Sequence, residues 1–253
     1  MKTAIEIKGK QFTHEKPMIC IPIVEETEAA ILAKMDELMQ EPQDMVEWRI
    51  DYFEDQLDVD RVTSVLEKLQ EKSGDTILVA TIRTKVQGGL YQGDEVEYET
   101  ALIGIAASGF ADVLDVEFFT VDKQEELFRI LHGFGAVIIS SHHDFQETPE
   151  LDVMRMLLRD MAVYSDIVKL AVMPNHVGDV LDLLRVTYEY QSAYGSPIIS
   201  MSMGKLGMVS RISGEVFGSC VTFGTVGKTS APGQMERKEL RHALDFMHEH
   251  YVD

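Results

Sequence analysis

Short apolar runs and amphipathic stretches alternate from one end of the chain to the other. The apolar runs are rich in β-branched residues and have about the length of strands buried on both faces. A loop with polar or glycine residues follows each run, and then a stretch with helical periodicity. The runs begin near Met18, Met45, Thr76, Ala111, Ala136, Ile167, Pro197 and Cys220.

These eight strand-and-helix units predict a closed parallel barrel. The average spacing between the runs is about 29 residues, which is the size of one βα unit. Eight such units form a (β/α)₈ (TIM) barrel, and a length of 253 residues suits one such domain. We therefore predict an α/β fold with a single barrel domain over residues 1–253. An open, doubly wound parallel sheet is the alternative.

Local signals predict where several elements begin and end. Residues 1–15 resemble a β-hairpin preceding the barrel, with its turn at Lys8-Gly9-Lys10. Thr148-Pro149 is typical of an N-cap followed by the first helical position. Asn175 is the predicted N-cap of the next helix, and Gly195 lies just past the end of that helix.

The net charge narrows the classes of partner. The chain has 43 acidic and 23 basic residues, which gives a formal net charge of -20. Such a surface repels nucleic acid and anionic membranes, so neither is an expected partner. A small anionic substrate remains compatible with this charge if a few arginines reverse the field locally.

Cysteine usage and hydropathy favour a cytoplasmic protein. Cys20 and Cys220 lie in apolar runs, and we expect them to be buried thiols and not a disulfide. The chain opens without a secretory apolar region, and no apolar run is long enough to cross a bilayer. The cytoplasm is therefore the expected compartment.

Polar residues interrupt two of the predicted strands at alternate positions. Glu47, Arg49 and Asp51 are expected on one face of the second strand, because side chains alternate with period two. Helices cover the outside of a barrel, so this face points inward, where Arg49 must pair with one or both carboxylates. Asp115 and Glu117 repeat the pattern in the fourth strand. A structural ion-pair network and a substrate site are both compatible with this pattern.

Lys169 is the most informative single residue. It lies in the middle of DIVKLAVMP, a run that must be a buried strand. Burial disfavours the charged form of a lysine, and a neutral amine is the form that attacks a carbonyl carbon. The alternative is a structural lysine neutralised by a carboxylate in the core.

The ends of other strands supply further candidates. His142 and His143 end the fifth strand, where one of them faces inward and is a candidate acid/base for proton transfer. Arg83 and Arg211 suit a carboxylate or a set of hydroxyls, as does Arg49, because a guanidinium offers forked donors. The glycine-rich segment after the eighth strand is a shaped loop, and its residues Ser230 and Gln234 offer hydrogen bonds.

Motifs that bind metals or cofactors are missing from the sequence. Cys20 and Cys220 lie far apart in the sequence, no His-x-x-x-His pair is present, and there is no Walker loop or dinucleotide-binding fingerprint. We therefore expect chemistry without a metal or an organic cofactor.

Six segments taken together resemble the type I 3-dehydroquinate dehydratases. They are EWRID, TIRTK followed by GG, SSHHDF, DIVKLAVMP, MGKLGMVSRISGEVFGS and TFGTVGKTSAPGQ. The similarity covers nearly the whole chain, and DIVKLAVMP and SAPGQ are its most specific parts. The resemblance implies a homodimeric enzyme of the shikimate pathway, in aromatic amino acid biosynthesis. Such an enzyme converts 3-dehydroquinate to 3-dehydroshikimate with loss of water.

The resemblance also implies roles for individual residues. Lys169 matches the lysine that forms a Schiff base with the substrate ketone, and His143 matches the general acid/base. If one histidine removes the proton and then protonates the departing hydroxyl, the elimination is syn. The residues implied to bind the substrate's carboxylate and hydroxyls are Glu47, Arg49, Arg83, Arg211, Ser230 and Gln234.

One position departs from the family's pattern. The loop after the third strand generally has a glutamate that supports the histidine, and this chain has Gln87 there. The side chain keeps its size and loses its charge, so any help that an anion gives to His143 is weakened. We include Gln87, Asp51 and Asp115 as supporting residues of the site.

Two other functions remain compatible with the residues. A class I aldolase also uses a barrel lysine, but it more often holds a phosphorylated sugar on glycine amides after the last strands. Arginines and the Ser230–Gln234 pair favour a carboxylate instead. A non-catalytic barrel that only binds a ligand is the second alternative, and Gln87 is the residue that favours it.

Overall fold

The parallel sheet is the centre of the computed structural model, which describes residues 5–228 and 230–251. Its strand order is β11-β10-β3-β4-β5-β6-β7-β8-β9, and the neighbouring strands run parallel. The strands are β3 (Met18–Ile23), β4 (Met45–Arg49), β5 (Ile77–Thr81), β6 (Val113–Glu117), β7 (Val137–Asp144), β8 (Ile167–Val172), β9 (Ile198–Ser202), β10 (Val221–Thr225) and the short β11 (Met235–Glu236).

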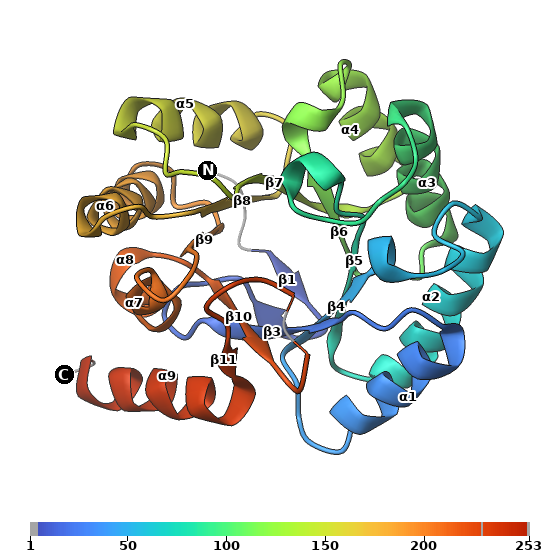
Figure 1. The fold of residues 1–253 in the computed structure, drawn as a ribbon, viewed down its shortest axis with the longest axis horizontal. Coiled ribbons are helices and arrows are strands. Elements are labelled where there is room, and N and C mark those ends of the chain that lie inside the picture. Colours follow the sequence, from blue (N-terminus) through green and yellow to red (C-terminus); the bar gives the residue numbers. More distant parts are fainter. Residues whose placement is uncertain (1–4, 229, 252–253) are drawn as a thin grey trace.

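The sheet closes on itself between β9 and β10. Residues Ile198 and Ser219 form an isolated parallel bridge, and the Cys220 amide donates to the Ile198 carbonyl at 2.8 Å. Strands β3 to β10 therefore form the predicted (β/α)₈ barrel, seen along its axis in Figure 1. The open doubly wound sheet is excluded.

Helices surround the barrel on its outside (Figure 1). The longer ones are α1 (Glu28–Leu38), α2 (Val59–Ser73), α3 (Glu95–Ser108), α4 (Gln124–Gly133), α5 (Leu151–Ala162), α6 (Val177–Tyr194) and α9 (Arg237–Tyr251). Two short helices, α7 (Met208–Ile212) and α8 (Gly214–Phe217), connect β9 to β10. Three 3₁₀ turns follow strand ends: η1 (Ile50–Tyr52), η2 (Lys85–Gln87) and η3 (Phe118–Thr120). Within the described residues, no helix is both long and apolar enough to cross a membrane.

Alternation along each strand divides the buried residues into two sets. On β5, Leu78 and Ala80 pack in the outer core with the helices, whereas Ile77 and Val79 belong to the cluster inside the barrel. The inward positions nearest the carboxyl ends of β4, β6 and β7 are polar, and Lys169 is an inward residue in the middle of β8. This alternation places several ionisable side chains together at one end of the barrel.

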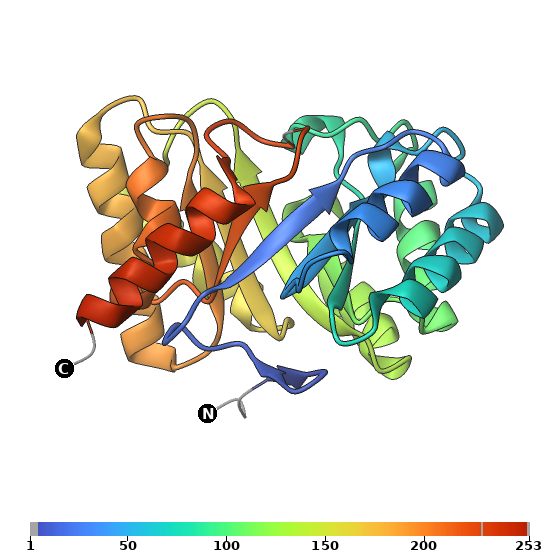
Figure 2. The same ribbon diagram turned by 90° about the horizontal axis from the view of Figure 1, so that it is seen from below.

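The N-terminal hairpin closes the other end. Strands β1 (Glu6–Ile7) and β2 (Lys10–Gln11) pair antiparallel, and Lys8 and Gly9 turn the chain with φ of 50° and 75°. Phe12 packs in the inner cluster of the barrel. Figure 2 shows the hairpin below the barrel and the loop around residue 230 at the opposite end. The predicted hairpin is confirmed for residues 5–12, residues 13–15 are not part of it, and residues 1–4 lie outside the described part.

The predicted start of α5 is wrong. The helix begins at Leu151 after Glu150, two residues later than Thr148-Pro149 suggests. The Thr148 hydroxyl donates to the Met173 carbonyl at 3.1 Å, so a contact with the loop after β8 replaces the expected cap. A long-range partner has outcompeted the local capping pattern here.

The start of α6 differs by one residue from its prediction, and its end agrees. The N-cap is His176, not Asn175, and the Asp179 carboxylate accepts from the backbone amides of both residues. Gly195 follows the helix with φ of 59°, a left-handed conformation that glycine adopts without steric cost.

Candidate active site

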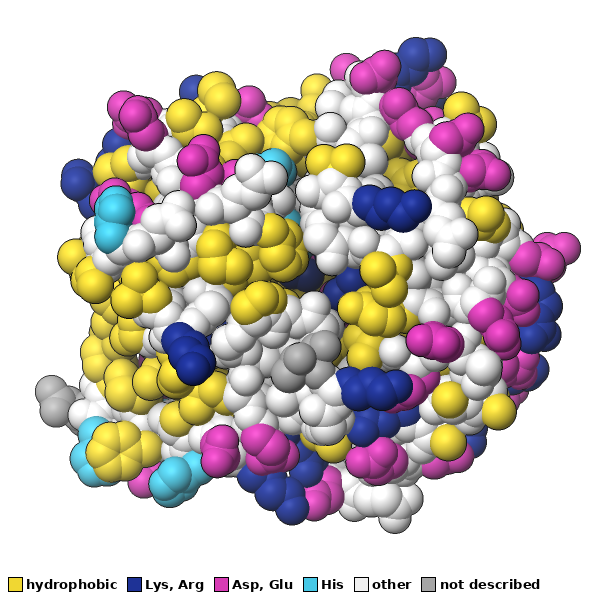
Figure 3. Space-filling model, in the orientation of Figure 1, with side chains coloured by type: hydrophobic (Ala, Val, Ile, Leu, Met, Phe, Trp, Pro, Cys, Tyr) yellow, Lys and Arg dark blue, Asp and Glu magenta, His cyan; other side chains and the backbone are white. Residues whose placement is uncertain are grey.

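A pocket opens at the carboxyl ends of the barrel strands, the end at which barrel enzymes hold their active sites. In Figure 3 the same face has a small opening near its centre with Lys or Arg side chains inside it and hydrophobic ones beside it. The residues that line the pocket are Glu47, Arg49, Arg83, Gln87, Gly88, His143, Phe145, Lys169, Ala171, Met201, Met203, Phe223, Ser230, Ala231 and Gln234.

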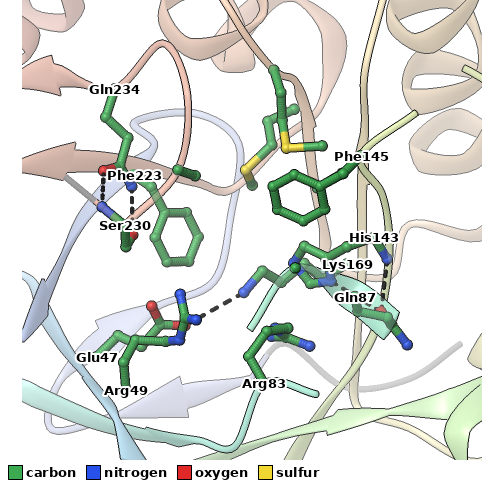
Figure 4. A pocket seen from close by; sticks show the side chains of 15 residues that line it. Glu47, Arg49, Arg83, Gln87, His143, Phe145, Lys169, Phe223, Ser230 and Gln234 are labelled. Atoms are coloured by element: carbon green, nitrogen blue, oxygen red, sulfur yellow. Dashed lines mark hydrogen bonds and ion pairs between the residues drawn. The ribbon is translucent and has the colours of Figure 1, made fainter. Parts of the chain in front are cut away.

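Lys169 lies on β8 with its amine at the floor of this pocket (Figure 4). The side chain is 4% exposed, and its Nζ lies 2.8 Å from Asp115 Oδ2 and 3.5 Å from Glu47 Oε1. The same nitrogen lies 4.5 Å from the centre of the Phe223 ring. The amine is therefore buried, oriented by two carboxylates and accessible to a ligand in the pocket.

Asp115 is shared between Lys169 and Arg83. Arg83 Nη2 lies 2.7 Å from Asp115 Oδ1, and Arg83 Nη1 lies 3.1 Å from Glu117 Oε1. Burial by itself raises the pKa of Asp115, but the charges of Arg83 and Lys169 outweigh burial and hold that pKa well below its usual range. Asp115 is therefore ionised at neutral pH and balances positive charge at Lys169.

The face predicted for β4 is confirmed for two of its three residues. Glu47 and Arg49 line the pocket, and Glu47 Oε1 also accepts from the Thr81 hydroxyl at 2.9 Å. Asp51 is not on the strand, because β4 ends at Arg49 and Asp51 lies in the turn η1.

Asp51 nevertheless supports the site from behind. Its carboxylate pairs with Arg49 through two hydrogen bonds of 2.7 and 2.8 Å, as the buried charges required. It also accepts from the backbone amides of Arg83 and Leu90, at 3.3 and 3.0 Å. Asp51 therefore holds both the Arg49 guanidinium and the loop after β5 in place.

His143 is the histidine of the pair that faces the pocket. His142 points the other way, with its ring edge-on to Phe119 at 5.3 Å between centroids. Burial, followed by the charges of Arg83 and Lys169, lowers the pKa of His143 well below its usual value. The ring is therefore neutral at neutral pH, which is the form that accepts a proton.

Gln87 contacts His143, as its position in the sequence suggested. Its Oε1 lies 2.8 Å from the backbone nitrogen of His143 and 3.2 Å from Nδ1 of the ring (Figure 4). The 3₁₀ turn η2 holds Gln87 at this place, and the side chain is 4% exposed. An uncharged amide therefore occupies the position beside the ring.

Ser230 and Gln234 both line the pocket, but they bind each other. Gln234 Oε1 accepts from the Ser230 backbone amide at 2.9 Å, and Gln234 Nε2 donates to Ser230 Oγ at 2.9 Å. In Figure 4 Ser230 lies beside Phe223, and Gln234 lies above Ser230. A ligand that uses either group must replace these hydrogen bonds.

Arg211 lies on α7, outside the described residues that line the pocket. It is 1% exposed, and its Nη2 donates to the Pro232 carbonyl at 3.0 Å. Its Nε and Nη1 have no hydrogen-bond partner within residues 5–228 and 230–251. Burial lowers the pKa of Arg211 to about 10. The guanidinium therefore holds the loop around Pro232 and keeps two buried donors for a further acceptor.

The apolar wall of the pocket did not stand out in the sequence. Ala171 follows Lys169 by two positions, Phe145 follows His143 by two, and Met201 and Met203 are also two apart. The period-two spacing from a recognised inward residue is the signal that identifies such positions. The remaining lining residues without a sequence prediction are Gly88, Phe223 and Ala231.

Among the described residues, no three histidine, cysteine, aspartate or glutamate side chains are grouped so as to hold a metal ion. Cys20 and Cys220 are free and buried, and burial raises the pKa of both thiols.

Comparisons with known proteins agree on one family. A family model described as Type I 3-dehydroquinase matches residues 19–251. A 3-dehydroquinate dehydratase of Listeria monocytogenes serotype 4b is 38% identical over 252 residues, which cover 98% of this chain and 99% of that protein.

Two solved structures are similar along the whole chain. The 3-dehydroquinate dehydratase of Geobacillus kaustophilus has a TM-score of 0.95 and 31% identity, and the match covers 99% of this chain and 98% of that one. The type I enzyme of Clostridium difficile, with covalently modified comenic acid, has a TM-score of 0.93 and 36% identity. That match covers 98% of this chain and 99% of the other.

Proposed function

The chain belongs to the type I 3-dehydroquinase family, and from this premise we propose that it dehydrates 3-dehydroquinate through an imine between the substrate ketone and Lys169. Its enzymatic class is that of a 3-dehydroquinate dehydratase, a hydro-lyase. The observation that carries the proposed mechanism is a buried amine at the floor of the pocket, 2.8 Å from the Asp115 carboxylate.

Glu47 and Asp115 have different roles in imine formation. The amine of Lys169 attacks the ketone carbon once it is neutral, and loss of water from the adduct leaves a cationic imine. Glu47, with Oε1 3.5 Å from Nζ, is placed to take the proton that the amine releases. Asp115, with its lowered pKa, stays ionised and stabilises the positive charge of the imine.

Elimination then requires one base and one acid on the same side of the ring. The cationic imine withdraws electrons, so the proton on the adjacent carbon becomes acidic enough for neutral His143 to remove it. The resulting enamine expels the hydroxyl β to the imine, and protonated His143 donates the proton that leaves with it as water. Because one imidazole does both, the elimination is syn. Hydrolysis of the imine releases the product and returns the lysine.

We assign substrate binding to the arginines and to the Ser230–Gln234 pair. Arg49 and Arg83 already pair with carboxylates, so they are held rigid and offer only their remaining N–H groups to the hydroxyls. Arg211 has two unpaired buried nitrogens, and it is the arginine that we assign to the substrate carboxylate. Ser230 and Gln234 exchange their mutual hydrogen bonds for bonds to the substrate.

The setting of the reaction follows the same resemblance. We propose a role in aromatic amino acid biosynthesis in the cytoplasm, carried out by one barrel domain that works as a homodimer without an organic cofactor or metal. The full-length similarity to bacterial 3-dehydroquinate dehydratases supports this setting.

Replacement of Lys169 tests the proposed mechanism. Lys169→Ala, or Lys169→Met where the length of the side chain has to be kept, should lose nearly all turnover of 3-dehydroquinate and keep the barrel's circular dichroism. Lys123→Ala, on a lysine with 77% side-chain exposure, is the matched control and should keep full activity. Turnover that survives both replacements of Lys169 refutes the imine.

A further inference from the structure

The amide of Gln87 lies between two partners of fixed polarity. On one side, its Oε1 lies 2.8 Å from the backbone nitrogen of His143 and 3.2 Å from the ring Nδ1. On the other side, its Nε2 lies 3.3 Å from the hydroxyl of Thr120, the last residue of η3. Thr120 contacts Glu117 in turn, with Oγ1 2.7 Å from Oε2.

The contact with His143 determines which end of the Gln87 amide faces the histidine. A backbone N–H can only donate, so the Gln87 atom that faces it has to be the carbonyl oxygen and not the NH₂ group. The ring Nδ1 faces the same oxygen. An acceptor against an acceptor gives no hydrogen bond, so Nδ1 carries the proton in this arrangement.

The Glu117 side requires the same orientation independently. The carboxylate accepts four hydrogen bonds: Oε1 from Arg83 Nη1 at 3.1 Å and the Thr84 amide at 2.9 Å, and Oε2 from the hydroxyls of Thr84 and Thr120, both at 2.7 Å. With both oxygens occupied by donors, the Thr120 proton points to Glu117. The lone pair that remains on Thr120 can receive only an N–H, so the NH₂ group of Gln87 faces Thr120.

From this agreement we propose that Thr120 is a positioning residue for His143. Because Glu117 accepts from the Thr120 hydroxyl, Thr120 accepts from the Gln87 NH₂ group, and the Gln87 oxygen is left to accept from the imidazole. The ring proton is therefore on Nδ1. The unprotonated Nε2 is then the atom presented to the substrate. This inference rests on the proposed role of His143 as the base.

The tautomer matters because the amide carries no charge. A carboxylate beside the ring attracts an imidazolium and orients it at the same time, whereas an amide can be rotated by 180° and would then favour the opposite tautomer. In that tautomer Nε2 carries a proton and cannot accept another. Thr120 and the His143 backbone amide together hold the amide in the productive orientation.

The ¹⁵N resonances of the histidine side chains test the tautomer directly. In the full chain labelled at its 8 histidines, His143 should give the pattern of a neutral ring protonated at Nδ1, assigned by its loss in His143→Gln. Thr120→Val, which has the same shape without the hydroxyl, should move this pattern toward a mixture of the two tautomers. Thr120→Ser should restore it.

Thr84→Val is the matched control. It also removes a 2.7 Å hydroxyl bond to Glu117 Oε2, but no contact with the amide of Gln87, so the tautomer pattern should stay as in the parent. A parent ring protonated at Nε2 overturns the proposal, and so does a pattern that Thr120→Val leaves unchanged. An equal shift in Thr84→Val overturns it as well, because the effect would then come from Glu117 alone.

Turnover completes the test through a double-mutant cycle. Thr120→Val should lower kcat about 3- to 10-fold, the range that one lost neutral hydrogen bond corresponds to, with KM little changed. In a Gln87→Ala background the same replacement should not lower kcat further, because the amide through which Thr120 acts is absent. A loss that persists in that background overturns the proposal. Since the ¹⁵N pattern needs no turnover, a failure of the proposed dehydration is distinguishable from a failure of the positioning role.

Discussion

Gln87→Glu is the most informative change beside His143. It places a negative charge where the amide oxygen now lies, 3.2 Å from Nδ1 of His143. At that distance and an effective dielectric constant of about 20, opposite charges attract by about 5 kcal/mol, or roughly four pKa units. Desolvation of the new carboxylate, together with the nearby Glu117, offsets part of this attraction. We expect the pKa of His143 to rise by about one to two units, within the range of known carboxylate neighbours.

The sign of the pH effect follows from the proposed role of the His143 ring as the base. His143 has to be neutral in the free enzyme, so kcat/KM falls as the pH drops through its pKa. In the parent that pKa lies well below its usual value, and the acid limb should begin at correspondingly low pH. In Gln87→Glu the acid limb should move to higher pH. Turnover on the plateau should rise by a factor of a few to tens, because the base is stronger and a charge-assisted hydrogen bond orients it.

The assay is the pH–rate profile of the parent, Gln87→Glu and the control Gln124→Glu, which adds the same charge at the start of α4. The control should reproduce the parent profile. An unchanged profile in Gln87→Glu refutes the contact between residue 87 and His143. The acid limb can also move to higher pH while the plateau falls. That result would show that Thr120 cannot support the new side chain, because its hydroxyl has one proton and would face two carboxylates, Glu117 and residue 87.

Two further predictions concern the loop that covers the pocket. Arg211→Ala should weaken substrate binding by about 2–5 kcal/mol. Arg211→Lys should recover only part of this loss, because an ammonium lacks the forked donors of a guanidinium. Unchanged kcat and KM in both variants would refute the assignment of Arg211 to the substrate carboxylate. Gly233→Ala should lower kcat/KM roughly tenfold more than Gly227→Ala does. Both glycines have positive φ, so the backbone strain of the replacement is similar, but only at Gly233 would the new Cβ meet a backbone atom, the Gly204 oxygen at 2.4 Å. Equal effects of the two replacements would show that the loop position does not matter.

The barrel and its inward residues could be predicted from the sequence because both depend on local periodicity. Lys169 interrupts an apolar run, and period two around it leads to Ala171 and to the pocket. Glu47 and Arg49 follow from the same alternation on β4. His142 and His143 were recognised as a pair near the end of a strand, at the edge where strand ends of a parallel barrel meet, and the family resemblance singled out His143.

Partners that come from segments after the strand ends could be predicted only in part. Asp51 was expected on β4, but the strand ends at Arg49 and a 3₁₀ turn carries Asp51 away from the pocket. Thr120 likewise lies in the turn after β6, and no periodicity connects it with Gln87. The Thr148 cap failed for a similar reason, since its hydroxyl bonds to the loop after β8. Contacts between such turns depend on tertiary packing, which local patterns do not encode.

Reduction with borohydride in the presence of 3-dehydroquinate tests the central claim most directly. Borohydride converts an imine into a stable secondary amine, so the ligand mass should remain on the protein and activity should be lost. Peptide mapping should place this mass on the peptide that contains Lys169, and Lys169→Met should acquire none. A ligand mass on another lysine, or no ligand mass with activity intact, would contradict the account.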